Sequence, residues 1–246
     1  MRCVAGRVFT CLAALFVLPD DGWADAVVAT ARYTDPTPRY DHGILGDALE
    51  WGNLHVTVAG HGGTRTIYEF KLPETRVYED IAPRLWDVTG DGAPEVVVIE
   101  SHVDKGARLL VFGLEQGQLR ALGATPYIGR THRWLAPVGA ADLDGDGRIE
   151  IAYVDRPHLA KVLRIWRLDG DGLRHVRDVA GLTNHKIGWD FFVGGLRDCG
   201  GGPEVIAADA GWQQIVAMRL SGGKADIRPL VRYTGPDDFA PIMSCH

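Results

Sequence analysis

The stretch AADLDGDGRIEIAYVD, residues 140–155, joins a loop rich in aspartate and glycine to an apolar run that begins at a glutamate. The same order returns in LWDVTGDGAPEVVVIES (85–101) and in GLRDCGGGPEVIAAD (195–209). The three glutamates recur at intervals of 55 and 54 residues, as Glu95, Glu150 and Glu204. Self-similarity at such a period indicates stacked supersecondary units.

Each of these segments is followed by a second pattern, in which apolar and polar residues alternate on both sides of a turn. It is seen in ARLLVFGLEQGQLRAL (107–122), KVLRIWRLDGDGLRHV (161–176) and QQIVAMRLSGGKADI (213–227). Period-two alternation around a turn that contains glycine is typical of a β-hairpin. Each unit therefore reads as strand, loop, strand and hairpin, with no helix expected. Four antiparallel strands at this spacing are typical of a β-propeller blade.

We therefore predict an all-β fold, a small β-propeller of four four-stranded blades at about 36–80, 81–129, 130–185 and 186–236. A β-sandwich is the alternative all-β fold, but it does not require equal spacing. ARYTDP (31–36) resembles VRYTGP (231–236), so residues 27–35 are expected to complete the last blade or a fifth, incomplete one. Such closure would remove an open sheet edge, which otherwise invites aggregation.

Residues 1–26 are expected to be a signal peptide that precedes a single propeller domain, residues 27–246. Two arginines precede the apolar run 8–18, which is too short to span a bilayer, and Ala24 and Ala26 offer small residues for cleavage. The alternative is an uncleaved membrane anchor. No later segment is apolar enough to span a membrane, so the mature protein is expected to be soluble and periplasmic or secreted.

The cysteines and the net charge change when the leader is removed. Cys3 and Cys11 leave with it, and Cys199 and Cys245 remain as an even pair in an oxidising compartment. We predict a disulfide between them; two independent thiols are the alternative. The formal charge of −6 becomes −5, because the leader holds two arginines and three aspartates. An acidic chain argues against nucleic acid as the main partner.

The loop at 142–150 has the ligand pattern of a calcium site. Carboxylates alternate along it, and Gly145 and Gly147 permit a tight curl. Hard oxygen ligands on one short loop suit calcium. A solvated acidic turn is the alternative. The predicted ligands are Asp142, Asp144, Asp146, Glu150 and the backbone carbonyl of Arg148.

The other loops depart from this pattern by degrees. Residues 87–95 keep the spacing with one threonine in place of a carboxylate, which predicts weaker calcium binding by Asp87, Thr89, Asp91 and Glu95. In the third copy Asp198 falls at the second ligand position, with Leu196 and Gly200 at the first and third, so no metal is predicted. A second Asp-Gly-Asp-Gly, residues 169–172, aligns with the hairpin turns of the other units and is predicted to be a turn.

These loops resemble the FG-GAP/VCBS repeat family, the calcium-loop propeller blades also found in integrin α heads and in many exported bacterial proteins. The resemblance rests on DVTGDGAPEVVVI and DLDGDGRIEIAYV, less securely on RDCGGGPEVIAA, and covers roughly residues 81–236. It implies a propeller fold with calcium bound by the alternating loop positions of the first two copies. The chain departs from the family in its third loop and in having fewer blades than the usual seven.

Three histidines recur near the start of the first strand of a blade: His42, His132 and His185. Arg133 and Lys186 follow two of them. Equivalent positions in propeller blades converge on one axis, so these side chains are candidates for a site at one mouth of the channel that holds an anionic ligand or a metal. The alternative is that each histidine satisfies a loop carbonyl within its own blade.

The sequence contains no nucleophile elbow, no His-Glu zinc motif and no phosphate-binding loop, so we do not expect an enzyme. The first hypothesis is an exported calcium-binding FG-GAP/VCBS-type propeller that acts as a protein- or glycan-binding or structural module. The alternatives are a small periplasmic enzyme with its site at the channel mouth, and a scaffold in which calcium is purely structural. Fold by itself does not decide between them.

Overall fold

A computed structural model describes residues 26–246, so the predicted signal peptide, with Cys3 and Cys11, lies almost wholly outside the described residues. The fold is all-β, as predicted, with strands β1 to β17 and antiparallel pairing throughout. None of the helices formed by residues 26–246 is long and apolar enough to cross a membrane.

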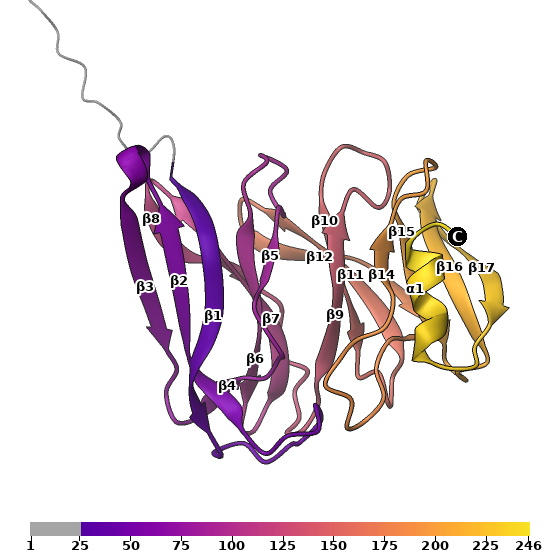
Figure 1. Ribbon diagram of the computed structural model, residues 1–246, viewed down its shortest axis with the longest axis horizontal. Helices are drawn as coiled ribbons and strands as arrows, with labels where there is room; N and C mark the ends of the chain where they lie inside the picture. Colours follow the sequence, from indigo (N-terminus) through magenta and orange to yellow (C-terminus); the bar gives the residue numbers. More distant parts are fainter. Residues whose placement is uncertain (1–25) are drawn as a thin grey trace, which may run out of the picture.

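The strands form four successive units, which run from β1–β3 at the left of Figure 1 to β14–β17 at the right. In the second, third and fourth units the strand order follows the chain. The first unit contains β1 (Val27–Thr37), β2 (Glu50–Ala59) and β3 (Arg65–Lys71), and the second β5 (Arg84–Trp86), β6 (Glu95–His102), β7 (Gly106–Glu115) and β8 (Gln118–Ala124). The third contains β9 (Leu135–Ala141), β10 (Glu150–Asp155), β11 (Val162–Asp169) and β12 (Gly172–Ala180), and the fourth β14 (Gly195–Arg197), β15 (Glu204–Asp209), β16 (Gln214–Ser221) and β17 (Lys224–Arg232).

Two short strands lie between the units. β4 (Arg76–Tyr78) pairs with both β2 and β6, and so joins the first two units into one eight-stranded sheet. β13 (Leu182–Thr183) pairs with β15, as β14 does. β4 and β5 both pair with β6, so they are two parts of an interrupted first strand of the second unit. β13 and β14 are likewise two parts of the first strand of the fourth unit. In the third unit β9 is continuous, with a register shift opposite Ala152 and Tyr153.

The apolar runs after the three glutamates are explained by burial on both faces. β6, β10 and β15 are buried along almost their whole length, because the second and third units pack between neighbouring units and the fourth packs between the third unit and the C-terminal segment. One core lies between the second, third and fourth units, and another between the first and the second. Strands buried on both faces read as continuous apolar runs, which is what VVVI, IAYV and VIAA are.

The predicted closure by the N-terminal residues is wrong. β1 pairs with β2 from Val27↔Ala59 to Thr37↔Glu50, so residues 27–35 belong to the first unit. The physical reason is its apolar face: Val28 and Tyr33 are buried in the core between the first and second units. The likeness of residues 31–36 to residues 231–236 does not reflect a shared sheet.

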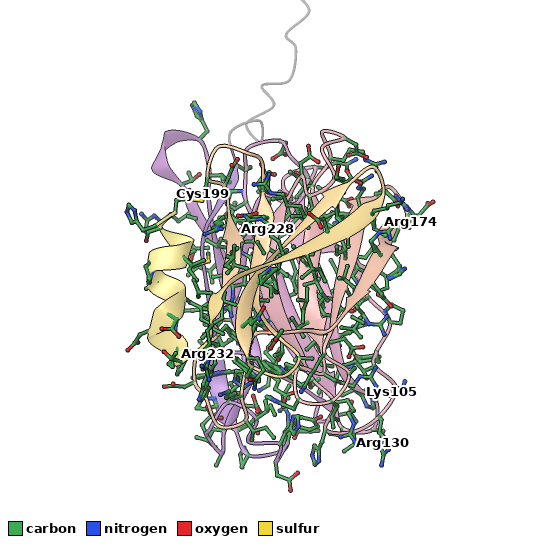
Figure 2. All side chains as sticks on the ribbon, turned by 90° about the vertical axis from the view of Figure 1, so that its right-hand side faces the viewer. Lys105, Arg130, Arg174, Cys199, Arg228 and Arg232 are labelled. Atoms are coloured by element: carbon green, nitrogen blue, oxygen red, sulfur yellow. A yellow bond between two sulfur atoms is a disulfide. The ribbon has the colours of Figure 1, made fainter. Side chains whose placement is uncertain are left out.

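The outer face of the fourth unit is covered by a helix that the sequence did not predict. α1 (Phe239–Met243) follows a 3-10 turn, Pro236–Asp238, and buries Phe239 and Ile242 against β15 and β16. It lies along one side of the fourth unit, with Cys199 near one end (Figure 2). The predicted disulfide Cys199–Cys245 is confirmed and ties the chain end to the β14–β15 loop. The second Asp-Gly-Asp-Gly is the turn between β11 and β12, as predicted.

Candidate functional site

The loops at 87–95 and 142–150 share one backbone design. Each begins with an aspartate directly after the first strand of its unit, and that carboxylate accepts backbone N–H groups of two glycines. For Asp142 the donors are Gly145 at 2.8 Å and Gly147 at 2.9 Å. For Asp87 they are glycines at 2.6 and 2.9 Å. All four glycines have φ between 79° and 89°, a conformation that side chains disfavour: Gly90, Gly92, Gly145 and Gly147.

Three of the predicted calcium ligands lie together. One carboxylate oxygen from each of Asp142, Asp144 and Asp146 lies within 4.8 Å of the others, and two of these side chains are half-buried. Converging hard oxygens with partial access to solvent fit a calcium ion. Among residues 26–246 this is the one gathering of three side chains that could hold a metal. These residues would hold the ion, with the carbonyl of Arg148 next along the loop.

The glutamates at the ninth loop position point elsewhere. Glu150 is fully buried and accepts the backbone N–H of Leu143 at 2.9 Å. Glu95 does the same for Val88 at 2.8 Å. In both loops the glutamate therefore ties the end of the loop to its second residue, and Glu150 is not part of the aspartate group.

Glu150 also pairs with a cation that the sequence analysis did not single out. Arg167, on β11, donates from Nε to Glu150 Oε1 at 2.6 Å and from Nη1 to Asp146 Oδ2 at 2.8 Å. Its Nη2 lies 3.3 Å from Asp144 Oδ2. Arg167 is only 5% exposed, so a fixed positive charge stands beside the loop carboxylates. The loop carboxylates repel one another, and a calcium ion would relieve that repulsion. Arg167 already relieves part of it.

The loop at 87–95 has no such arginine. Gly113, on the facing strand, lies next to Glu95, and a Cβ there would meet Glu95 Cγ at 3.0 Å. Glu95 accepts backbone N–H groups of its own loop, and Asp91 accepts that of Ala93 at 2.8 Å. Thr89 Oγ1 lies 3.5 Å from Glu95 Oε1, so all four predicted ligands have partners within or beside the loop.

The third loop is two residues shorter between its aspartate and its glutamate, 198 to 204, than the others. Asp198 accepts the backbone N–H groups of Gly200 and Gly202, as Asp142 accepts those of two glycines in its own loop, so Asp198 is the structural equivalent of Asp142. Its placement at the second ligand position is therefore wrong, because the shorter loop shifts the alignment. Glu204 is surrounded by Arg197, Arg219 and Arg228, with nitrogen–oxygen distances of 2.7, 2.9 and 2.9 Å.

The predicted histidines lie at the other end of the strands, where loops of all four units meet. The rings of His42 and His132 stack with centroids 5.0 Å apart, and both line a cavity of about 230 Å³. His185 is buried behind it, where its Nε2 donates to the carbonyl of Trp189 at 2.8 Å. Its Nδ1 therefore accepts a hydrogen bond from His158 Nε2 at 3.1 Å in the neutral ring. His158, not His185, is the third histidine of the cavity wall.

Buried acids lie directly behind this cavity. His42 Nδ1 is 2.5 Å from Glu79 Oε1, and Ser101 donates its hydroxyl to the other oxygen of Glu79. Burial raises the pKa of Glu79 and that of the nearby Glu50. Burial, together with Arg133, lowers the pKa of His42 to about 4. The interruption between β4 and β5 places Glu79 here, since it is the first residue after β4.

The cavity also contains backbone that carries strain. His132 has a φ of 53° and Arg156 a φ of 46°, values uncommon for residues with a side chain. Both residues line the cavity. Strain of this kind tends to gather at functional sites, because the surrounding structure must hold it in place. Spacing alone gave no sign of Glu79, Arg156 or His158.

Residues 87–153 match a family model described as an FG-GAP-like repeat. The matched segment begins at the first aspartate of one acidic loop and ends inside β10, so it contains both acidic loops. The resemblance expected from DVTGDGAPEVVVI and DLDGDGRIEIAYV is confirmed. The third copy, RDCGGGPEVIAA, lies outside the matched residues.

Other comparisons add little to the FG-GAP-like match. No curated protein matches the chain. Among solved structures, an exotype rhamnogalacturonan lyase, YesX, is similar at 14% sequence identity and a TM-score of 0.39. The similarity covers 72% of this chain, which spans 40% of the length of that one.

Beyond the FG-GAP-like segment, the cluster at Glu204 predicts a pH dependence of stability. Burial alone would raise the pKa of Glu204, but hydrogen bonds from Arg197, Arg219 and Arg228 hold it below its ordinary value of 4.5. The cluster therefore stabilises the fold fully above that value and loses its effect as the pH falls through the lowered one. Urea unfolding measures the free energy of unfolding of wild type and Glu204→Gln at each pH from about 7 to about 3. Plotted against pH, the two free-energy curves should converge at low pH. Curves that stay parallel would show that Glu204 is not ionised in the cluster.

Proposed function

We propose that this protein is an exported, calcium-stabilised module of propeller-type blades that binds a protein or a glycan. The observation that carries the proposal is the Asp142–Asp144–Asp146 group within an FG-GAP-like segment. The blades form an open array, in which α1 covers the outer face of the fourth unit in place of a closing blade. No catalytic activity and no nucleic-acid partner are assigned to it.

Export is proposed from the leader and from the disulfide. The run 8–18 and the small residues before position 27 have the form of a cleavable signal. Cys199–Cys245 is a bond that persists in oxidising compartments and is rare in the cytosol. Both observations support a periplasmic or secreted protein.

The calcium part is tested by the stability of residues 27–246 with calcium and with excess chelator. A site of extracellular affinity should stabilise by about 1–3 kcal/mol at millimolar calcium. We expect the effect in wild type and its loss in Asp144→Ala/Asp146→Ala. The matched control is Asp169→Ala/Asp171→Ala, which removes the carboxylates of the other Asp-Gly-Asp-Gly copy and should leave the calcium effect intact. Equal calcium effects in all three proteins would rule out the 142–150 loop.

The enzyme alternative has one observation in its favour, the contact of His42 with buried Glu79 at the wall of a cavity. A screen of glycans and small metabolites by thermal shift, followed by product analysis of every hit, separates the candidates. Binding without turnover supports the binding module, and turnover supports the enzyme. Calcium stabilisation without any ligand supports a purely structural scaffold.

A further inference from the structure

The cavity beside His42 and His132 is built by loops far apart in sequence. The connection from β1 to β2 runs along the lower edge of the molecule in Figure 1 and reaches the fourth unit, where Gly188 donates its N–H to the carbonyl of Ile44 at 3.1 Å. Tyr40, on the same connection, accepts the backbone N–H of His132 at 3.0 Å. The cavity is therefore held by tertiary hydrogen bonds.

One cation in the cavity wall has no acidic partner. Arg156 is paired with Asp155 through two hydrogen bonds of 2.8 and 3.0 Å. Arg133 donates from Nη1 to the carbonyl of His132, and no carboxylate among residues 26–246 forms an ion pair with it. A half-buried guanidinium without a counter-charge is a ready partner for an anion, because it can offer two parallel N–H groups to a carboxylate.

His42 adds a second donor to the same wall. Glu79 is fully buried beside Asp80, and burial raises its pKa and that of the neighbouring Glu50, so a glutamate ion beside a neutral His42 is disfavoured. The Glu79–His42 pair is therefore neutral overall and holds two protons, one of which lies between Glu79 Oε1 and His42 Nδ1. Wherever that proton sits, Nε2 of His42 keeps its own hydrogen. This N–H lies on the ring edge opposite Glu79, and the imidazole lines the cavity. Glu79 is thus a positioning residue for an N–H donor.

Part of the wall is apolar. It is formed by one buried indole and by aliphatic side chains, two of which are 63% and 69% exposed: Trp134, Ile44, Leu159 and Ile187. Exposed aliphatic residues around a cavity offer surface to the apolar part of a ligand. The histidines do not gather as metal ligands, since the aspartate group is the one such gathering in the described part of the chain.

We propose that this cavity binds a small organic carboxylate, with its carboxylate between Arg133 and Nε2 of His42 and its apolar body against Trp134. The inference goes beyond the proposed function, because the cavity and the aspartate group lie at opposite ends of β10, about 17 Å apart by the rise per residue of a strand. Loss of either site leaves the other in place, so their failures are distinguishable.

The test uses benzoate as a probe, with benzamide as its uncharged counterpart and inorganic phosphate as an anion without an apolar body. Binding of each to residues 27–246 is measured by calorimetry. Benzoate should bind saturably, benzamide and phosphate at least about tenfold more weakly. Arg133→Gln should weaken benzoate binding by about tenfold or more, and His42→Gln should also weaken it.

Arg130→Gln is the matched control, since Arg130 lies three residues away on the same connection. It is exposed, does not line the cavity and projects at the lower margin of the molecule (Figure 2). This variant should bind benzoate as wild type does. Failure of benzoate to bind, equal binding by Arg133→Gln with unchanged thermal stability, or tighter binding of phosphate than of benzoate would each overturn the proposal.

Discussion

Replacing Arg167 with glutamine is expected to lower the free energy of unfolding by about 3–5 kcal/mol in calcium-free buffer, because it leaves the buried carboxylate of Glu150 without its partner. The same change frees Asp144 and Asp146 from the guanidinium. Calcium should then bind more tightly than in wild type, and should restore a larger part of the stability. Urea unfolding with chelator and with millimolar calcium measures both effects.

Arg219→Gln is the matched control for this variant. Arg219 occupies the corresponding place on β16, but Glu204 keeps Arg197 and Arg228 when it is removed. The loop beside it carries glycines where the 142–150 loop carries aspartates. Its loss of stability should be smaller and should not respond to calcium. If Arg167→Gln costs less than about 1 kcal/mol, or if calcium restores no more stability than in wild type, the arginine does not compete with the ion.

Removal of the disulfide by Cys199→Ser/Cys245→Ser is expected to lower the free energy of unfolding by about 3–4 kcal/mol. The bond closes a loop with a sequence separation of 46 residues, and its loss increases the entropy of the unfolded chain. In the folded state it also holds α1 over the fourth unit, where Phe239 and Ile242 are buried.

The measurement is urea unfolding of the serine variant beside wild type with and without reductant. Reduced wild type should match the variant, which separates the bond from any effect of the serines. The packing of α1 is the competing source of stability, since Arg197 also donates to the carbonyl of Ile242. If all the proteins unfold at the same urea concentration, that packing alone secures the chain end.

A good part of the fold could be predicted from the residues themselves. Apolar runs after Glu95, Glu150 and Glu204 predicted three equivalent strands, and glycines in the connecting segments predicted loops and hairpins. Both signals are local, since alternation and turn chemistry act over a few residues. The family resemblance rested on the same loops, and the match at 87–153 covers the two that carry carboxylates.

The candidate metal site was predictable only in part. The alternation of Asp142, Asp144 and Asp146 placed three carboxylates on one curl of the chain, and they lie together. The role of Arg167 depended on strand pairing, because β11 brings Arg167 opposite Glu150. A trace of this is visible in FGLE, WRLD and MRLS, where glycine or arginine occupies the same position of each hairpin.

The sequence by itself determined the repeating units, their acidic loops and the cysteine pair, because those features arise from residue patterns that act within one unit or from a simple count. Only the tertiary structure decided where the chain ends pack, which loop holds an internal cation, and that His42, Arg133 and His158 line one cavity with Glu79 buried behind it. The physical reason is distance along the chain. Burial of a side chain such as Val28 or Phe239 depends on which apolar face it meets, and no local pattern encodes that partner.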